Sequence, residues 1–448
     1  MSQEARKTKA EQGFADQLEA AQETLPGTSD WALELRATGR HAYLSAGLPH
    51  RRVEEWKYTD LRTLVREAYP PAPTLGVALT GDDIAAVLGE HMAAIDAYRI
   101  VIVDGQLRTE LSDMDALGTD GEINSLAEAL DAPSAWVKDA LGAVNPPESD
   151  PVAALNMALM TGGVAVRLAD GACPDKALHI VHVHAAQTAS HIATRNLLVI
   201  GERANATVIE SYVATSQVPA QRSVVTEAAI GKGARLTHVK YQNEADETVH
   251  LSSWMMRLEA EATYAGFQFS TGAAVARNQA FVRFAGEGAV SHVNGAVMLR
   301  GKQHNDTTMV IDHAVPGCES REHFKAVIDD DARAINQCKA IVQPHAQKSD
   351  GHQMAQALLL SETAEFDSKP ELEIFADDVV CGHGSTSGQV DDELLFYLRS
   401  RGIPEAQARA LLVAAFVGEV VEKIEDEPVR EALLGASRAW LGARELEQ

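Results

Sequence analysis

A thiol and an imidazole one residue apart are the side chains in this sequence best suited to metal chemistry. Cys381 and His383 lie in FADDVVCGHGST, where glycines follow an apolar run. If a strand persists through them, both side chains point to the same face. Thiolate and imidazole together suit iron, zinc or copper. A closed iron–sulfur cluster needs about four protein ligands. The pair therefore implies either further ligands from a partner protein or a labile cluster.

Other interpretations of this pair stay open. For an isolated Cys-x-His, a buried cysteine beside a hydrogen-bonded histidine at a strand end is the commoner arrangement. A cysteine hydrolase is disfavoured, because nothing nearby resembles an oxyanion loop followed by its helix.

A second group of histidines lies in LHIVHVHAA and contains His179, His182 and His184. His182 and His184 would share a strand face, as in metal-binding barrels. The glutamate that usually follows such a pair is absent from AAQTAS. We therefore expect the polar outer face of a strand at this position.

The composition excludes several classes of protein. The net charge is −25, with 64 acidic and 39 basic residues, and such a surface repels nucleic acid and anionic lipid. The first fourteen residues contain no apolar secretory core, and no stretch reaches the roughly 18 apolar residues of a membrane helix. No phosphate-binding glycine loop is present. We expect a cytoplasmic protein that is neither an ATPase nor a dehydrogenase, and a flavin site stays open because many lack a short motif.

From about residue 163 short apolar strands alternate with small or acidic turns, and an alanine opens each repeat. The alanines are Ala206, Ala234, Ala262, Ala289, Ala332 and Ala364. The first four follow one another at a nearly constant interval of about 28 residues. The longer intervals before the last two would carry insertions. A repeat of this length holds several short strands, which favours a β-solenoid over a β-sandwich.

Helical patterns flank the repeats. Thr28, Ser29 and Asp30 offer caps for a helix that Gly47 and Pro49 end, and further helical patterns continue to about residue 160. Asp391 and Asp392 can cap ELLFYLRSRG, and a second C-terminal helix follows to about Glu425. We predict a mainly β protein with an N-terminal helical region (1–160), a solenoid core (161–388) and a C-terminal helical region (389–448).

Three segments resemble the SufD branch of the SufB/SufD family of the SUF iron–sulfur cluster assembly system. They are GLPHRRVEEWKYTDL (47–61), the long segment 345–386 that ends in CGHGST, and GQVDDELLFYLRSRG with the helix after it (388–424). The SufB branch resembles VEHEAT where this chain has CGHG. Gly382 and Ser385 replace the more usual serine and alanine around His383.

The resemblance implies a right-handed parallel β-helix between helical ends, acting as a non-catalytic scaffold. It implies pairing with SufB, and docking of the SufC ATPase on residues of about 391–425. A transient iron–sulfur cluster would form at the SufB–SufD interface, with His383 and then Cys381 as candidate metal ligands. Reduced flavin is associated with such complexes, and no permanent cofactor is expected in the isolated chain. Alone, the chain could pair with a second copy as a homodimer.

Two alternatives from other classes remain at this point. A carbohydrate-active β-solenoid would need export and an aromatic groove, which the missing signal and the 5% aromatic content disfavour. A stand-alone His/Cys metalloenzyme would need a closed group of ligands, and few cysteines and histidines are grouped that way.

Overall fold

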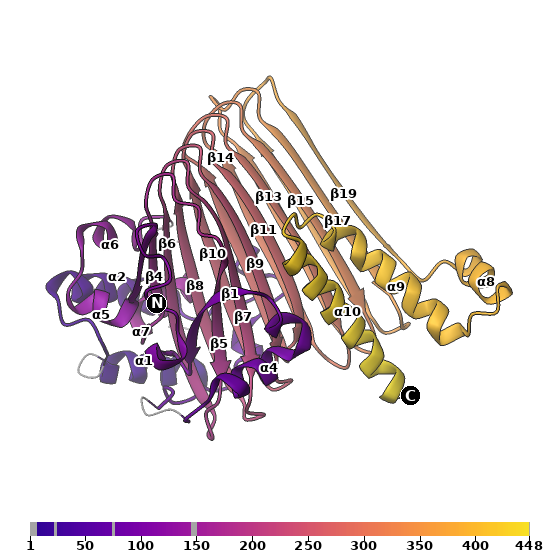
Figure 1. Ribbon diagram of the computed structural model, residues 1–448, viewed down its shortest axis with the longest axis horizontal. Coiled ribbons are helices and arrows are strands. Elements are labelled where there is room, and N and C mark those ends of the chain that lie inside the picture. Colours follow the sequence, from indigo (N-terminus) through magenta and orange to yellow (C-terminus); the bar gives the residue numbers. More distant parts are fainter. Residues whose placement is uncertain (1–6, 22–24, 74–76, 145–149, 448) are drawn as a thin grey trace, which may run out of the picture.

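The computed structural model describes residues 7–21, 25–73, 77–144 and 150–447 of the 448-residue chain. The expected absence of a secretory signal concerned residues 1–14, of which the first six lie outside the described residues. The chain forms a parallel β-solenoid with helices at both ends, which confirms the predicted fold class (Figure 1). No described helix combines the length and the apolarity that crossing a bilayer requires.

The solenoid consists of two facing sheets of ten and nine strands, here called the β19 sheet and the β18 sheet after their last strands. The β19 sheet contains β1 (Ala97–Val103), β2 (Gln106–Leu107), β5 (Ala177–His184), β7 (Asn205–Ala214), β9 (Arg235–Glu244), β11 (Thr263–Gly272), β13 (Val290–Leu299), β15 (Glu319–Ile328), β17 (Asp350–Leu359) and β19 (Val380–Gly388). The β18 sheet contains β3 (Gly121–Ser125), β4 (Val164–Leu168), β6 (Ser190–Ile200), β8 (Ala220–Ile230), β10 (Val249–Leu258), β12 (Val275–Phe284), β14 (His304–His313), β16 (Arg333–Val342) and β18 (Glu365–Ile374).

Each turn of the solenoid contributes one strand to each sheet, and the backbone register fixes the repeat. Arg235 pairs with Thr263, and Thr263 pairs with Val290, so each step between equivalent positions is one full turn. Glu319 pairs with Asp350 across a slightly longer turn. The predicted repeat is therefore one turn of the solenoid, and its length varies little because the strands are of nearly constant length.

The prediction of the alanine repeat was wrong in two details. Ala206 pairs with Leu236, so Ala204 is the residue equivalent to Ala234. Ala332 and Ala364 precede β16 and β18, in the other sheet, so the long interval before Ala332 is a change of sheet and not an insertion. Alanines recur just before the strands because each strand begins at a tight corner of the solenoid, where the backbones of adjacent turns are in contact.

The N-terminal region contains strands as well as helices, contrary to the expected run of helices to residue 160. β1 pairs in parallel with β5, and β3 pairs antiparallel with β4, so both sheets begin before residue 126. The segment between residues 97 and 125 lacks helical periodicity, and its apolar run AYRIVIV forms β1. The proposed division at residues 160 and 388 stays a prediction.

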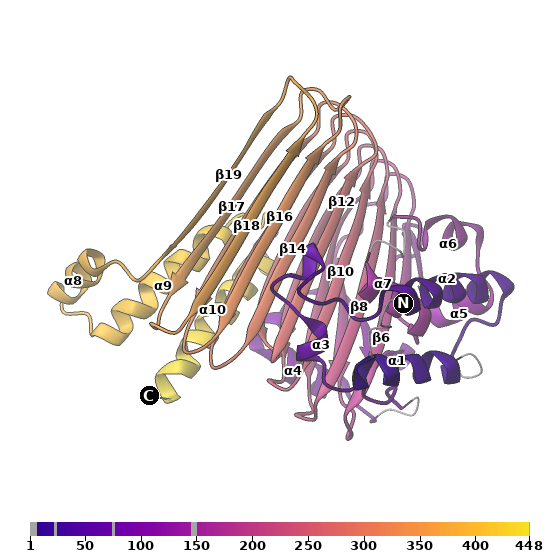
Figure 2. The same ribbon diagram turned by 180° about the vertical axis from the view of Figure 1, so that it is seen from behind.

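Helices cover the outer face of each sheet. On the β18 sheet lie α1 (Lys9–Ala20), α2 (Asp30–Ala46), α5 (Leu126–Asp131), α6 (Ala135–Ala140) and α7 (Pro151–Leu159) (Figure 2). On the β19 sheet lie α4 (Gly81–Ala93), α9 (Glu405–Val421) and α10 (Glu427–Glu447) (Figure 1). Of the three candidate caps, Ser29 caps α2, its hydroxyl accepting from the Ala32 N–H, and Gly47 follows the helix with a positive φ of 70°.

The segment 47–61, part of the family resemblance, straps across the β18 sheet. It contains η2 (Glu54–Trp56) and leads into α3 (Leu61–Leu64); η3 (Thr109–Leu111) lies farther along the chain. The Arg277 guanidinium lies 3.8 Å from the centre of the Trp56 ring and donates to the Glu55 carbonyl at 2.7 Å. Lys369 of β18 reaches Glu54. The strap therefore connects the N-terminal region to the last turn of the solenoid.

Candidate metal site at the last strand

β19 is the last strand of its sheet and carries both residues of the CGHG pair. It pairs in parallel with β17, with Gly351 opposite Cys381 and Gln353 opposite His383. In the part of the chain that the structure describes, no strand pairs with its other edge. β18 ends the second sheet in the same way, so the last turn presents unpaired backbone N–H and C=O groups.

Cys381 and His383 project to the same side of β19, because they are two residues apart in one strand. It is the side on which Gln353, the neighbour of His383, is buried. The thiol is half-buried, and the imidazole is exposed and makes no hydrogen bond or ion pair with any described residue. The sequence thus predicted correctly that the two side chains share a face, though not that they differ in exposure.

Burial raises the pKa of the Cys381 thiol, against the opposing effect of the Gly351 backbone hydrogen bond. The group therefore carries its proton at neutral pH, and a metal ion that bound there would have to displace that proton, since the thiolate is the metal ligand. A protonated thiol is oxidised less easily than a thiolate.

Glycines on either side of His383 leave little bulk around the pair. A β-carbon at Gly384 would lie 2.7 Å from the Met354 Cε atom, and one at Gly382 would lie 3.5 Å from the His352 Cδ2 atom. Side chains of the preceding turn therefore fill the places where side chains of β19 would be. The two glycines thus allow β17 and β19 to approach each other closely on the face opposite Cys381 and His383.

A charged group lies on the opposite side of the sheet. His352 Nδ1 lies 3.0 Å from Asp350 Oδ1, and Arg321 donates to Asp350 Oδ2 at 2.9 Å. The hydrogen bond from Arg321 is the main cause that lowers the pKa of Asp350. Since His352 alternates with Gly351 along β17, its side chain faces away from Cys381 and does not complete that ligand pair.

Across the described residues, no group of three or more His, Cys, Asp or Glu side chains is arranged to hold a metal ion. The CGHG pair therefore offers two potential metal ligands and does not form a closed site with other described residues. Thiolate and imidazole can bind iron in such an incomplete site only transiently.

The prediction for the histidines of LHIVHVHAA was wrong, because all three are completely buried. The His182 ring stacks on Tyr212 inside the solenoid, with centroids 4.7 Å apart. His184 Nδ1 lies 3.0 Å from the buried Asp104 carboxylate, and His179 Nε2 lies 2.7 Å from Ser211. Burial lowers the pKa of His179 and His182 to about 3, so both are neutral packing residues.

Sequence reasoning missed polar side chains inside the last turns. Glu322, Gln353 and His383 occupy equivalent positions in β15, β17 and β19. Burial raises the pKa of Glu322 to about 8, against the opposing effects of Ser320 and Arg321. The available signal was that these three residues are separated by one turn each, but this spacing becomes visible only once the register is known.

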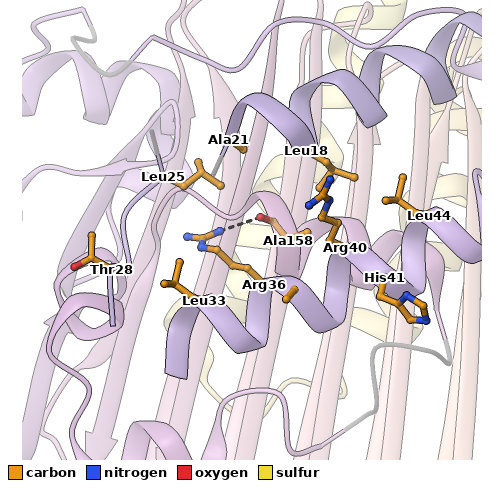
Figure 3. Close-up of a pocket in the computed structure, with 12 residues that line it drawn as sticks. Leu18, Ala21, Leu25, Thr28, Leu33, Arg36, Arg40, His41, Leu44 and Ala158 are labelled. Atoms are coloured by element: carbon orange, nitrogen blue, oxygen red, sulfur yellow. Dashed lines mark hydrogen bonds between the residues drawn. The ribbon is translucent and has the colours of Figure 1, made fainter. Parts of the chain in front are cut away.

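A separate pocket of about 720 Å³ lies beside α1, α2 and α7 at the other end of the molecule (Figure 3). Leucines line it, and Arg36 donates to the Ala158 carbonyl at 3.0 Å. Arg36 also donates to two further carbonyls, so both terminal nitrogens of its guanidinium are held by the protein backbone. Among the described lining residues only His41 could ligate a metal, so this pocket has no part in the CGHG chemistry.

Comparison with known proteins agrees with this architecture. The family model described as SUF system FeS cluster assembly, SufBD core domain, matches residues 182–416, and the SufBD protein N-terminal region matches residues 8–180.

Three curated relatives carry corresponding names. The iron–sulfur cluster assembly protein SufD of Escherichia coli is 30% identical over 87% of this chain and 89% of its own length. A SufBD family protein of Synechocystis is 28% identical over 90% of each chain. SufD of Bacillus subtilis is 26% identical over 63% of this chain and 64% of its own. The resemblance inferred from the sequence is thereby confirmed, and the chain belongs to the SufBD family of the SUF system for iron–sulfur cluster assembly.

Proposed function

We propose that this chain is a non-catalytic scaffold subunit for iron–sulfur cluster assembly that supplies half of a site completed by a SufB-type partner. The observation that carries the proposal is the position of Cys381 and His383 on a terminal strand whose outer edge has no strand partner among the described residues. The nascent cluster is the cargo, and His383 and Cys381 are its ligands from this chain. Thiol burial and the incomplete ligand set suit a cluster that is built and then released.

The last turn has the character of an interface for the SufB-type partner. Two terminal strands offer backbone hydrogen-bonding groups, and Val380, Phe375 and Ile374 beside them are 61%, 59% and 41% exposed. Open strand edges with apolar side chains favour pairing with another chain. In the absence of that partner, the same edge would pair with a second copy as a homodimer.

The C-terminal helices suit a second partner, the SufC-type ATPase, at residues of about 391–425. α8 (Asp392–Ser400) projects from the body of the molecule (Figure 2). Its Leu394, Phe396 and Tyr397 side chains are 52%, 73% and 54% exposed. Large apolar side chains exposed together in this way are typical of a surface that a partner protein covers. ATP-driven movement of that partner would pull on α8 and α9, and α9 connects to the β19 sheet through Lys325 and Glu419.

This complex would be cytoplasmic, and reduced flavin belongs to the same proposal as a cofactor of the assembled complex. The test is co-purification with the SufB and SufC proteins of the same cell, followed by anaerobic reconstitution with iron and sulfide. We expect a ternary complex that gains cluster absorbance. His383→Ala should abolish the absorbance and leave the complex intact, whereas the matched variant His41→Ala, an exposed histidine of α2, should change neither. Unchanged cluster yield in His383→Ala would refute the ligand assignment.

A further inference from the structure

A pocket of about 720 Å³ lies between α1, α2 and α7, at the other end of the molecule from the CGHG pair (Figure 3). One face of α2 forms a wall of it, because Leu33, Ala37, Arg40 and Leu44 follow one another at intervals of three or four residues. Leu18 of α1 lies on the facing wall. Small-molecule sites in proteins measure about 300–1,000 Å³ and are mostly apolar, with a few polar groups that orient the ligand. The size and the lining of this pocket fit that description.

The two arginines of the pocket differ in how their charge is compensated. Both terminal nitrogens of Arg36 donate to backbone carbonyls, so that guanidinium is part of the protein's own packing. The Arg40 side chain makes no hydrogen bond or ion pair with any described residue, although its Nε atom is buried. It reaches toward Leu18 of α1 (Figure 3), and the described lining contains no carboxylate. A cation partly withdrawn from water without a partner is unfavourable, and an anion in the pocket would remove that cost.

The leucines on either side of Arg40 are not needed to hold α2 in place. α2 packs on α7 through a different face, so closely that a β-carbon at Gly39 would lie 2.7 Å from the Ala154 carbonyl oxygen. Leu33 and Leu44 are nevertheless 47% and 41% exposed. An uncovered apolar surface beside an unpaired cation favours a ligand that has an apolar tail and an anionic head.

We propose that this pocket is a binding site for a medium-chain fatty acid. The carboxylate of the ligand accepts two parallel hydrogen bonds from the Arg40 guanidinium, the geometry that arginine offers to carboxylates. The tail lies along Leu18, Leu25 and Leu33. Leu33 and Arg40 are seven residues apart in α2, which is about 10 Å along the helix axis, so the apolar part of the pocket suits a tail of medium length. The proposal is independent of the proposed function at the last turn.

Two other occupants fit the pocket less well. A phospholipid would bring the chain to a bilayer, and the net charge of −25 repels the anionic surface of a membrane. A helix of a partner protein would bring a polar rim, since protein interfaces carry about ten hydrogen bonds. The described lining offers little for such a rim, because the Arg36 guanidinium is bound to the backbone and the Thr28 hydroxyl donates to Asp131.

The test compares decanoate with 1-decanol, which has the same tail without the charge, by isothermal titration calorimetry on the purified full chain. We expect one equivalent of decanoate to bind, with a Kd at least tenfold lower than that of 1-decanol. Arg40→Gln should raise the Kd of decanoate at least tenfold and leave that of 1-decanol unchanged. Ala37→Phe places a ring in the pocket and should abolish the binding of both. The matched control Arg438→Gln, an exposed arginine of α10, should bind both ligands as the wild type does.

Several results would overturn the proposal. Equal Kd values of decanoate and 1-decanol in the wild type, or an unchanged Kd of decanoate in Arg40→Gln, would show that Arg40 does not recognise the head group. Unchanged binding in Ala37→Phe would place the ligand elsewhere. If one variant does not fold, by circular dichroism, the other decides.

The remaining outcome concerns a protein in the pocket. A wild-type chain that does not bind decanoate contradicts the proposal outright. Protection of α2 from hydrogen exchange in the complex with the SufB and SufC proteins would then assign the pocket to a partner helix. None of these results changes the assignment of Cys381 and His383, which the cluster reconstitution tests separately.

Discussion

The two ends of the solenoid carry the same spacing of metal-ligating residues in opposite surroundings. His182-x-His184 lies in β5, near the first turn, where β1, β2 and α4 cover the strand. Cys381-x-His383 lies in β19, where nothing in the described chain pairs with the outer edge. The first pair is buried and partnered, and the second is accessible and incomplete. Position in the stack of strands, and not spacing, decides whether such a pair is buried or reaches the surface.

Removing a histidine from each pair should give the largest difference. His184→Ala leaves the buried Asp104 carboxylate without its imidazole, which should cost about 3–5 kcal/mol of the free energy of unfolding. His383→Ala removes an exposed side chain and should cost less than about 0.5 kcal/mol. Urea unfolding followed by circular dichroism measures both. A similar loss of unfolding free energy in the two variants would contradict the distinction between a structural pair at one end and an accessible pair at the other.

The interior of the last turns should show its own pH dependence through Glu322. The unfolded carboxyl loses its proton near its ordinary value of 4.5, but burial raises the pKa of the folded group and holds the proton on it until about pH 8. Between these values the unfolded state binds fewer protons, so the free energy of unfolding falls as pH rises.

Glu322→Gln should remove this dependence and stabilise the protein at pH 8 by an amount on the order of 3 kcal/mol. Thermal unfolding of both proteins from pH 5 to pH 8 gives the measurement. Parallel curves for the two proteins over this range would contradict the assignment.

A substitution on the projecting helix α8 should weaken binding of the ATPase without lowering the stability of this chain. Phe396→Ser removes a side chain that is 73% exposed. If the SufC-type ATPase covers it, binding should weaken by about 2 kcal/mol, roughly 30-fold in Kd. The control Leu33→Ser, an exposed leucine of α2, should have no effect on binding. Isothermal titration calorimetry with the ATPase measures the Kd of each variant. Equal Kd values for Phe396→Ser and Leu33→Ser would place the docking surface elsewhere.

The smallest expected effect concerns the edge of the last turn. Val380→Lys places a charge beside an open strand, a device that discourages strand pairing. Pairing with the SufB-type partner, or with a second copy, should weaken about tenfold, which is about 1.4 kcal/mol. Analytical ultracentrifugation measures this, with Leu44→Lys on α2 as the control. Undiminished association would mean that the interface lies on another face.

The fold could be predicted from the sequence because its signals are local and repeated. Alternating apolar residues and small corner residues recur once per turn, and Ser29, Gly47 and Asp391 mark helix ends by their own chemistry. The switch of sheet at Ala332 could not be seen, because both sheets use the same corner residues. Only the backbone register separates them.

The candidate site was predictable in part. Cys381 and His383 are neighbours in sequence, so their shared face follows from alternation. The burial of His182 could not be foreseen, since it depends on Tyr212 in the next turn and on Asn196 of β6 in the other sheet. Glu322 was missed for a similar reason, because β15, β17 and β19 must be stacked in register before its position behind Gln353 becomes visible.

The central claim is that the last turn supplies half of a metal site, and mixing subunits tests it most directly. Iron and sulfide would be titrated without oxygen into this chain, into the SufB protein, and into an equimolar mixture of the two. We predict that full cluster absorbance arises in the mixture alone and disappears when this chain carries His383→Ala. The same cluster, assembled stoichiometrically by this chain without its partner, would contradict the account.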